Sequence, residues 1–418
     1  MDEIFSGTVA VIGLGYIGLP TAVVLATRGI EVIGVDVNPA TVAAVERGEV
    51  PFVEPDLAIA VSGAVSMGRL KSTTEMPHAD AYIVAVPTPF NDDHTADLSY
   101  IRSAVESIAP QLHGGELVIL ESTSPPGTSR LISEWIGELR PDLRMPHIGE
   151  GLPDVHIAHC PERVLPGRIM IEMITNDRIV GGITPRCAEV AASIYRVFCQ
   201  GAILLTDAAS AEMAKLVENA YRDVNIAFAN ELSLVCESLK LDVWEVIEMA
   251  NRHPRVNILT PGPGVGGHCI AVDPWFIVGA APELTPLIRT ARQVNDAKPR
   301  HVAQQVVAKA ARFKQPTVAC LGLAFKANVD DLRESPAVDI VAQICAGLPD
   351  TDILVSEPFV DRLPHRLAGI DNLHLTGADE AIEKADIIVL LVDHDQFRAV
   401  KKSRLAGKVV YDTRGTWR

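Results

Sequence analysis

The stretch TVAVIGLGYIGLPTAVVLATRGIEVIGVD, residues 8–36, decides the fold of this chain. It reads as an apolar strand, the glycine pattern G-x-G-x-x-G, a helix, and a second strand that ends in Asp36. Gly13 permits a tight turn, Gly15 lets the backbone approach a pyrophosphate, and Gly18 lets helix and strand pack closely. Asp36 is placed to bind a ribose hydroxyl and no arginine follows it, which predicts NAD rather than NADP.

Two further apolar runs, 81–86 and 117–120, follow at the spacing of a doubly wound α/β sheet. Each leads into a loop that contains proline, at the strand end where this kind of sheet binds ligands. The loops contain Thr88 and Thr123, which we predict to contact the cofactor. Either threonine would also suit a turn or a helix cap.

The composition is that of a globular protein of two or three domains. The chain has 418 residues and a net charge of −16, which argues against a broad nucleic-acid or anionic membrane surface. Its seven cysteines are scattered, the N-terminus does not read as a signal peptide, and no apolar run reaches about 18 residues. We therefore expect a cytoplasmic protein, with neither nucleic acid nor membrane among its partners.

The middle of the chain is predicted to be helical. The run 207–250 has the pattern of two helices, and 283–313 has that of another. Lys215, Asn219 and Arg222 fall on one helix face, which is either a solvated stripe or a ligand-facing one. Long central helices between two α/β domains often carry a subunit contact, so we expect a homodimer or a higher homo-oligomer.

The last third of the chain repeats the first. VACLG at 318–322 echoes VAVIG at 9–13, and later apolar runs echo the other strands in the same order. GLAFKA stands where GLGYIG stood, so no second dinucleotide site is expected. Lys326, Arg333 and Arg414 follow strands of this second domain, at the edge where they would either meet an anionic nucleotide or form surface ion pairs.

These patterns predict an α/β protein with two Rossmann-like doubly wound domains joined by a central helical dimerisation region. The expected divisions are an NAD-binding domain at 1–204, a helical region with a cysteine loop at 205–314, and a second Rossmann-like domain at 315–418.

The stretch PGPGVGGHCIAVDP, residues 261–274, presents Cys269 on a loop with few side chains. A lone cysteine is commonly a buried structural residue, but beside an NAD domain a thiol has a use. It can trap an aldehyde as a thiohemiacetal, whose oxidation gives a thioester that water hydrolyses to a carboxylate. Lys215 would then stabilise the oxyanion, Asp273 with a Lys215-bound water would act as base, and Glu162 would activate the hydrolytic water.

With these motifs the chain resembles the UDP-glucose/GDP-mannose dehydrogenase family along nearly its whole length. The motifs include VPTP, ESTSPPG, PERVLPG, AEMAKLVENAYRDVNIAFANEL, GPGVGGHCIAVDP and GLAFKANVDDLRESP. The resemblance implies that Lys215, Asn219, Cys269 and Asp273 form the active site, and that the second domain binds the UDP end of a sugar nucleotide. It also implies Tyr16 and Ile17 as NAD contacts. The UDP-sugar contacts that it implies are Arg163, Val164, Lys215, Asn219, Arg222, His253, Arg255, Gly266, Phe325, Lys326, Arg333 and Arg414.

Within the family, the runs 163–182 and 251–269 resemble the branch that acts on UDP-N-acetylmannosamine. UDP-glucose enzymes usually have a glutamate at the position of Pro166, which places a UDP-glucose assignment in doubt. The implied reaction is a four-electron oxidation of the C6 alcohol of UDP-N-acetylmannosamine to the uronate. UDP-glucose and UDP-N-acetylglucosamine are the alternative substrates.

Three other readings stay open from the residues. A sugar-nucleotide-binding protein without activity would have no need of Cys269 and Lys215. A two-electron hydroxyacid dehydrogenase would leave Cys269 and the second α/β domain without a purpose. A metal site at His268, Cys269 and Asp273 is disfavoured, because adjacent ligands on a tight loop rarely complete a tetrahedral site. No metal is therefore expected.

Overall fold

The computed structural model describes residues 4–52, 54, 56–91, 93–149, 151–164, 167–267 and 269–418. Pro166 and His268 lie outside these ranges. The chain forms two compact units, Met1–Val217 and Glu218–Arg418, and each is described by itself. In the described ranges, no helix is both long enough and apolar enough to cross a membrane.

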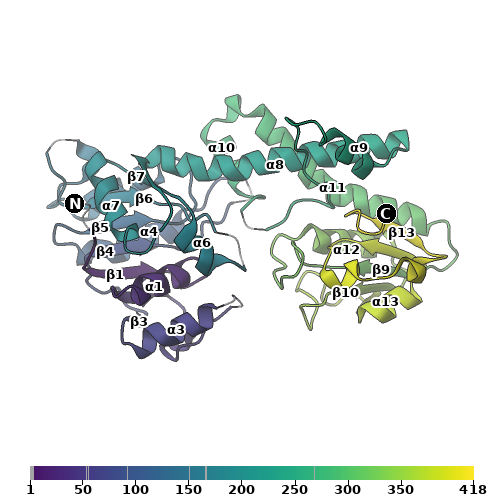
Figure 1. The fold of residues 1–418 in the computed structure, drawn as a ribbon, viewed down its shortest axis with the longest axis horizontal. Helices are drawn as coiled ribbons and strands as arrows, with labels where there is room; N and C mark the ends of the chain where they lie inside the picture. The colour runs from purple at the N-terminus through teal and green to yellow at the C-terminus, as the bar shows by residue number, and fades with distance from the viewer. Residues whose placement is uncertain are drawn as a thin grey trace. The chain divides into compact units, whose positions relative to one another are not determined.

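The first unit contains an eight-stranded sheet of order β3-β2-β1-β4-β5-β6-β7-β8 (Figure 1). From β3 to β6 all neighbours are parallel, in the 3-2-1-4-5-6 order of dinucleotide-binding folds. β7 pairs antiparallel with β6 and parallel with β8. The strands are β1 (Thr8–Ile12), β2 (Glu31–Val35), β3 (Leu70–Thr73), β4 (Ala81–Val84), β5 (Leu117–Leu120), β6 (His156–His159), β7 (Arg178–Gly182) and β8 (Ile203–Asp207).

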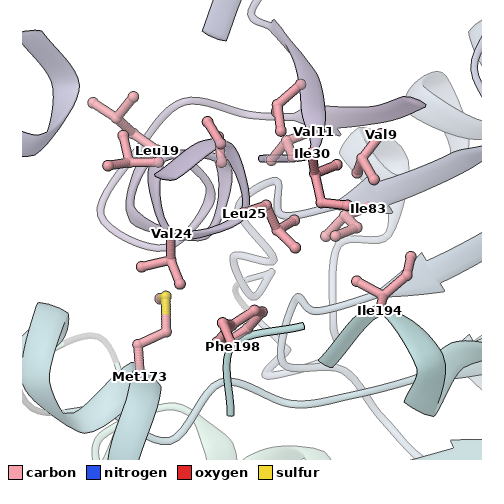
Figure 2. Close-up of a cluster of buried hydrophobic side chains, with 14 of the residues drawn as sticks. Val9, Val11, Leu19, Val24, Leu25, Ile30, Ile83, Met173, Ile194 and Phe198 are labelled. Atoms are coloured by element: carbon pink, nitrogen blue, oxygen red, sulfur yellow. The ribbon is translucent and has the colours of Figure 1, made fainter. Parts of the chain in front are cut away.

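Helices cover both faces of this sheet, because alternate residues of each strand point to opposite faces. Val9 and Val11 of β1 belong to one apolar cluster, and Ala10 and Ile12 belong to another. Figure 2 shows the first cluster, where Leu25 of α1 lies among the strand side chains. The helices are α1 (Gly18–Thr27), α2 (Pro39–Glu46), α3 (Leu57–Ser66), α4 (Ser99–Ile108), α5 (Thr128–Leu139), α6 (Ile169–Thr175) and α7 (Pro185–Tyr195), with short 3₁₀ turns η1 (Ala109–Gln111) and η2 (Pro146–Ile148).

The middle of the chain is helical, as the sequence predicted. The boundary between the two units falls inside its long helix, α8. Asn230, on the part of α8 in the second unit, is fully buried against α11. The helices of this region are α8 (Ala208–Leu239), α9 (Val243–Ala250), α10 (Asp273–Ala280) and α11 (Pro286–Ala310), with a 3₁₀ turn η3 (Pro282–Leu284).

The second unit contains a five-stranded parallel sheet of order β11-β10-β9-β12-β13. This is the first five-strand order of the other sheet repeated, so the predicted second doubly wound domain is confirmed. Its strands are β9 (Val318–Leu321), β10 (Ile353–Ser356), β11 (Leu373–Leu375), β12 (Ile387–Leu390) and β13 (Val409–Asp412). Its other elements are α12 (Pro336–Gly347), α13 (Ala378–Lys384), α14 (Asp395–Arg398) and η4 (Lys402–Leu405).

The acidic residue that follows the second strand has different surroundings in the two sheets. Glu357 follows β10, as Asp36 follows β2. The Glu357 carboxylate is buried, accepts the backbone N–H groups of Leu323 and Ala324 at 2.7 and 3.0 Å, and lies 3.1 Å from Nε2 of His394. Those three contacts are to Oε2, and Oε1 accepts the backbone N–H of Phe359 at 3.2 Å. Both oxygens are therefore engaged inside the domain, which gives a physical reason why a dinucleotide ribose would find no free acid there.

Candidate active site

The glycine-rich loop after β1 has the geometry that each glycine position requires. Gly13 has φ +92°, a conformation that side chains with a β-carbon rarely adopt. A β-carbon on Gly18 would lie 1.8 Å from the carbonyl oxygen of Gly13, so no larger residue fits there. A β-carbon on Gly15 would meet nothing within 4 Å. The loop is thus tight on its inner side and open at Gly15, where a pyrophosphate would approach.

Asp36 both shapes this loop and faces the ligand edge. Its Oδ2 accepts the backbone N–H of Leu14 at 2.9 Å, and its Oδ1 accepts that of Asn38 at 2.9 Å. Asp36 stays partly exposed, in contrast to the buried Glu357. A carboxylate has about four acceptor sites, so Asp36 keeps capacity for a ribose hydroxyl.

The other predicted NAD contacts lie around the same edge of the sheet. The ring of Tyr16 stacks on Phe52 with centroids 4.2 Å apart, and Ile17 is the N-cap residue of α1. Thr88 follows β4, and its buried hydroxyl has no hydrogen-bond partner among the described residues. Thr123 follows β5 and is half-buried. The open glycine and the unpartnered hydroxyl fit a bound dinucleotide, with Asp36 as its ribose acceptor.

Glu162 lies in a buried polar cluster rather than on an open loop. Its Oε2 accepts a hydrogen bond from Nη2 of Arg178 at 3.0 Å, and both side chains are almost fully buried. Its Oε1 accepts the backbone N–H of Arg163 at 2.6 Å. The Arg178 guanidinium also lies 5.0 Å from the ring centre of Tyr195. Sequence reasoning missed Arg178, whose only signal was a cation at the start of an apolar strand.

Glu121 is a second buried carboxyl of this cluster. It accepts hydrogen bonds from the hydroxyls of Thr21 and Tyr195, at 3.0 and 2.8 Å. Burial, followed by the nearby charge of Glu162, raises the pKa of Glu121 to about 7. One cation, Arg178, therefore faces two carboxyl groups, and Glu121 changes its protonation state near pH 7 rather than near pH 4.5.

The loop that contains Cys269 rests on the second α/β domain through its glycines. A β-carbon on Gly266 would lie 2.5 Å from the carbonyl oxygen of Glu334, and one on Gly267 would lie 3.0 Å from the ring of Phe325. Gly264 has φ +150°, and a β-carbon there would lie 2.8 Å from Pro336. Because these glycines have no side chains, the backbone of the loop can lie in direct contact with the domain.

Cys269 itself is exposed, unlike the other cysteines, which are buried or partly buried. Its carbonyl oxygen accepts the backbone N–H of Asp273 at 2.9 Å, at the start of α10. The side chain of Asp273 is buried and accepts a hydrogen bond from Nδ2 of Asn219 on α8. The structure therefore connects Asn219, Asp273 and the Cys269 turn within one unit.

The remaining α8 candidates differ in exposure. Lys215 is half-buried and Arg222 is exposed. Three residues before Lys215, the buried carboxylate of Glu212 accepts the backbone N–H groups of Gly127 and Ser129, at 2.5 and 2.7 Å. Glu212 thereby ties the first turns of α8 to the loop after Thr123, a role that the sequence pattern did not reveal.

Several predicted UDP-sugar contacts also have partners within the protein. The guanidinium of Arg333 pairs with Asp331 at 2.6 Å, and that of Arg414 pairs with Asp393 at 3.0 Å. Val164 packs at the border of the first core cluster. Four further candidates are placed by their exposure: Phe325 and Lys326 are half-buried, and His253 and Arg255 are exposed.

A pair of glycine substitutions tests the cofactor loop. We predict that Gly15→Ala leaves thermal stability unchanged, since its β-carbon meets open space, but weakens NAD binding by about tenfold or more. Gly18→Ala should lower the free energy of unfolding by roughly 1–3 kcal/mol or more through overpacking. Calorimetry of NAD binding and thermal unfolding measure both effects. Equal loss of stability in the two variants would contradict this account of the loop.

The pKa of Glu121 yields a pH-dependent prediction. Because its folded-state pKa of about 7 exceeds the ordinary 4.5, its stabilising contribution is complete below 4.5 and declines as pH rises toward 7. Glu121→Gln, which cannot ionise, should therefore gain up to about 3 kcal/mol of stability relative to the wild type between pH 4.5 and 8. Denaturant unfolding at several pH values measures this difference. A difference that stays constant with pH would refute it.

Three models of the UDP-glucose/GDP-mannose dehydrogenase family match the chain: the NAD-binding domain at residues 7–199, the central domain at 209–297 and the UDP-binding domain at 319–418. The chain is 57% identical to an NDP-N-acetyl-D-galactosaminuronic acid dehydrogenase of Ralstonia nicotianae, over 98% of this chain and 96% of that one. It is 53% identical to the UDP-N-acetyl-D-mannosamine dehydrogenase of Escherichia coli, over 98% and 99% of the two chains.

Solved structures agree with these matches. The UDP-D-ManNAc dehydrogenase of Pyrococcus horikoshii superimposes with a TM-score of 0.86 at 36% identity, covering 98% of this chain and 96% of that chain. The UDP-N-acetyl-mannosamine dehydrogenase of Staphylococcus aureus gives a TM-score of 0.84 at 39% identity, covering 98% and 95%. The chain therefore belongs to the UDP-glucose/GDP-mannose dehydrogenase family and is an NAD-dependent UDP-sugar dehydrogenase.

Proposed function

We propose that this enzyme oxidises the C6 alcohol of UDP-N-acetylmannosamine to the carboxylate in two steps, with Cys269 as covalent nucleophile. The observation that carries the proposal is the exposed thiol of Cys269, which shares a turn with the buried Asp273 that Asn219 holds. A plain alcohol dehydrogenase needs no nucleophilic thiol, whereas a four-electron oxidation needs a way to hold the aldehyde.

In the first step a base removes the proton of the C6 hydroxyl while C6 loses a hydride equivalent, which leaves an aldehyde. Asp273, with a water bound to Lys215, takes that proton. The thiol of Cys269 then gives up its proton to water and its sulfur bonds to the aldehyde carbon. The π bond of the carbonyl breaks at the same time, so that its oxygen becomes an oxyanion. Lys215 and Asn219 stabilise this oxyanion; a positioned donor of this kind is worth on the order of 10²–10³ in rate.

In the second step the thiohemiacetal is oxidised to a thioester, and water cleaves the C–S bond to give the carboxylate and the free thiol. Glu162 accepts a proton from that water, while Arg178 fixes its carboxylate in one orientation. NAD supplies the oxidising power of both steps, and it is held by the glycine loop, Tyr16, Ile17, Asp36, Thr88 and Thr123.

The UDP end of the substrate is assigned to the second α/β domain and to the loops around it. Its diphosphate carries negative charge, and the side chains proposed to bind it are largely cationic. The proposed contacts are Arg163, Val164, Lys215, Asn219, Arg222, His253, Arg255, Gly266, Phe325, Lys326, Arg333 and Arg414.

The identity of the sugar has two candidates. The printed names of the Escherichia coli, Pyrococcus horikoshii and Staphylococcus aureus relatives support UDP-N-acetylmannosamine. The 57% identical Ralstonia nicotianae protein supports a nucleotide-linked N-acetylgalactosamine sugar as the second candidate. Both names share an N-acetylated hexose, which disfavours UDP-glucose, as Pro166 also does. UDP-N-acetylglucosamine belongs to the same N-acetylated class.

We further propose a homodimer formed through α8. In the single chain this helix exposes an apolar stripe of Tyr221, Phe228, Val235 and Leu239, whose side chains are between 47% and 71% exposed. Apolar residues at intervals of seven and four lie on one helix face, the arrangement that packs against another helix.

The three-part division at 1–204, 205–314 and 315–418 is retained as a proposal, supported by the family matches. A cytoplasmic location is likewise proposed, since none of the cysteines forms a disulfide.

The NADH yield per sugar tests the reaction and the substrate together. With UDP-N-acetylmannosamine we expect two NADH per molecule and a carboxylate product, with less activity on UDP-N-acetylgalactosamine, UDP-N-acetylglucosamine and UDP-glucose. Cys269→Ala should form no carboxylate, because no thioester can form.

Two NADH from another sugar would keep the chemistry and replace the substrate. One NADH per sugar from the wild type would reject the role of Cys269, and no NADH with any of the four sugars would favour a binding protein.

The proposed dimer contact can be tested by placing one charged side chain in the apolar stripe of α8. Phe228→Glu should shift the protein to a monomer in sedimentation or light scattering, because two carboxylates would be buried at the helix contact. Ile59→Glu, at a 78% exposed residue of α3, is the matched control and should leave the mass unchanged. A wild-type protein that is a monomer in solution, or a Phe228→Glu variant with the same mass in solution as the wild type, would contradict the proposed dimer through α8.

A further inference from the structure

A buried chain of hydrogen bonds connects α11 and α8 to the loop that contains Cys269. Asn230 on α8 and Asn295 on α11 are at most 1% exposed. Oδ1 of Asn230 accepts the backbone N–H of Gly262 at 2.9 Å. Nδ2 of Asn230 donates to Oδ1 of Asn295 at 2.9 Å. Two side-chain amides thus link the first residues of the loop to the neighbouring helix.

The chain continues into a buried ion pair. Nδ2 of Asn295 donates to Oδ1 of Asp223 at 2.8 Å, and to the carbonyl oxygen of the same residue at 3.1 Å. The Asp223 carboxylate pairs with Nη1 of Arg292 at 2.6 Å. Arg292 and Asp223 are themselves buried, so few other partners are available to them.

The direction of every bond in this chain is determined by its ends. The N–H of Gly262 can only donate, so the oxygen of the Asn230 amide must face it. The nitrogen of Asn230 then faces the oxygen of Asn295, whose nitrogen faces Asp223. At the other end Arg292 has only donors, which keeps Asp223 as the acceptor. This arrangement gives a partner to both asparagine amides, while Oδ2 of Asp223 and Nε of Arg292 have none among the described residues. A network whose amides can face only one way favours one loop position.

The chain meets the loop at its entrance, where Gly262 lies close to the guanidinium of Arg414. A β-carbon on Gly262 would lie 2.7 Å from Nη1 of Arg414, so Gly262 lies between this guanidinium and Asn230. Further along, Gly264 and Gly266 pack against Pro336. After Cys269, Asp273 is held by Asn219. The segment that contains the thiol therefore begins and ends at side chains of α8.

We propose that Asn230 and Asn295 are positioning residues for the reaction, which hold the loop so that Cys269 meets the substrate carbon. This inference rests on the proposed function, since it concerns how the nucleophile is presented. Neither amide touches the reacting atoms. Misplacing a reacting group by about 1 Å can lower a rate by about 10²-fold, so a fixed loop is needed for the covalent step.

The test uses Asn230→Ala, Asn295→Ala and the double variant in the full chain, with the purified enzyme, NAD and UDP-sugar. Each single variant should lower kcat by roughly 10- to 100-fold and leave KM for the UDP-sugar within about twofold. Iodoacetamide should also alkylate Cys269 at a changed rate, as followed on its peptide by mass spectrometry. Because Asn295 acts through Asn230, the double variant should be no slower than Asn230→Ala within about twofold.

Ser233→Ala is the matched control. It removes the 2.5 Å hydrogen bond from Lys298, which joins the same two helices, and the 2.6 Å hydrogen bond from the Ser233 hydroxyl to the backbone carbonyl of Asn230. Neither bond involves the side-chain amide of Asn230 or the N–H of Gly262, so kcat should not change. If the asparagine variants lose only thermal stability, with kcat and alkylation like those of Ser233→Ala, the proposal is overturned. Additive losses in the double variant would also overturn it.

If the variants fail to fold, the proposal is tested instead by the hydrogen-exchange rate of the Gly262 backbone amide in the wild-type protein. A Gly262 amide protected as strongly as the α8 and α11 amides supports the proposal, and exchange at the rate of an open loop rejects it. The two proposals fail separately. Wild-type enzyme that does not release two NADH per sugar refutes the proposed function, whereas wild-type enzyme that releases two NADH, with variants that are unaffected, refutes only the positioning role.

Discussion

The absence of β-carbons in the loop before Cys269 is the constraint on which the rest of the account depends. A β-carbon would overlap Pro336 at Gly264 and the backbone of Glu334 at Gly266, and at Gly267 it would lie in tight contact with the ring of Phe325. The loop can therefore lie directly on a nucleotide-type domain, with the thiol exposed at its end. A domain without the dinucleotide fingerprint thereby supports the loop whose thiol we propose as the nucleophile.

The two sheets show how one topology serves two purposes. Both place a turn after the first strand and an acid after the second. Asp36 keeps part of its carboxylate at the ligand edge, whereas Glu357 is longer, buried and engaged by two backbone N–H groups and His394. Asp36 keeps acceptor capacity for the proposed cofactor contact, whereas Glu357 stabilises its own loop. The length and burial of the acid after the second strand thus distinguish the NAD-binding domain from the second domain, although both have the same strand order.

Most of the fold was predictable because local signals were strong. The glycine pattern before α1, the apolar strands of both sheets and the helical periodicity of α8 each identify an element without reference to distant residues. The antiparallel joining of β7 to β6 was not foreseen, since strand pairing depends on contacts far apart in sequence. The same holds for Arg178, Glu212 and Asn230: a single buried polar side chain leaves no periodic pattern, and its partners become known only in three dimensions.

The central claim is a covalent bond between Cys269 and the oxidised sugar, and the most direct measurement is mass spectrometry of the Glu162→Gln variant quenched with acid during turnover. Without the proposed base, thioester hydrolysis slows. The account predicts that a nucleotide-sugar acyl group accumulates on the peptide containing Cys269, and only when NAD and UDP-sugar are both present. An unmodified Cys269 in a variant that still produces NADH, or an adduct on another residue, would contradict it.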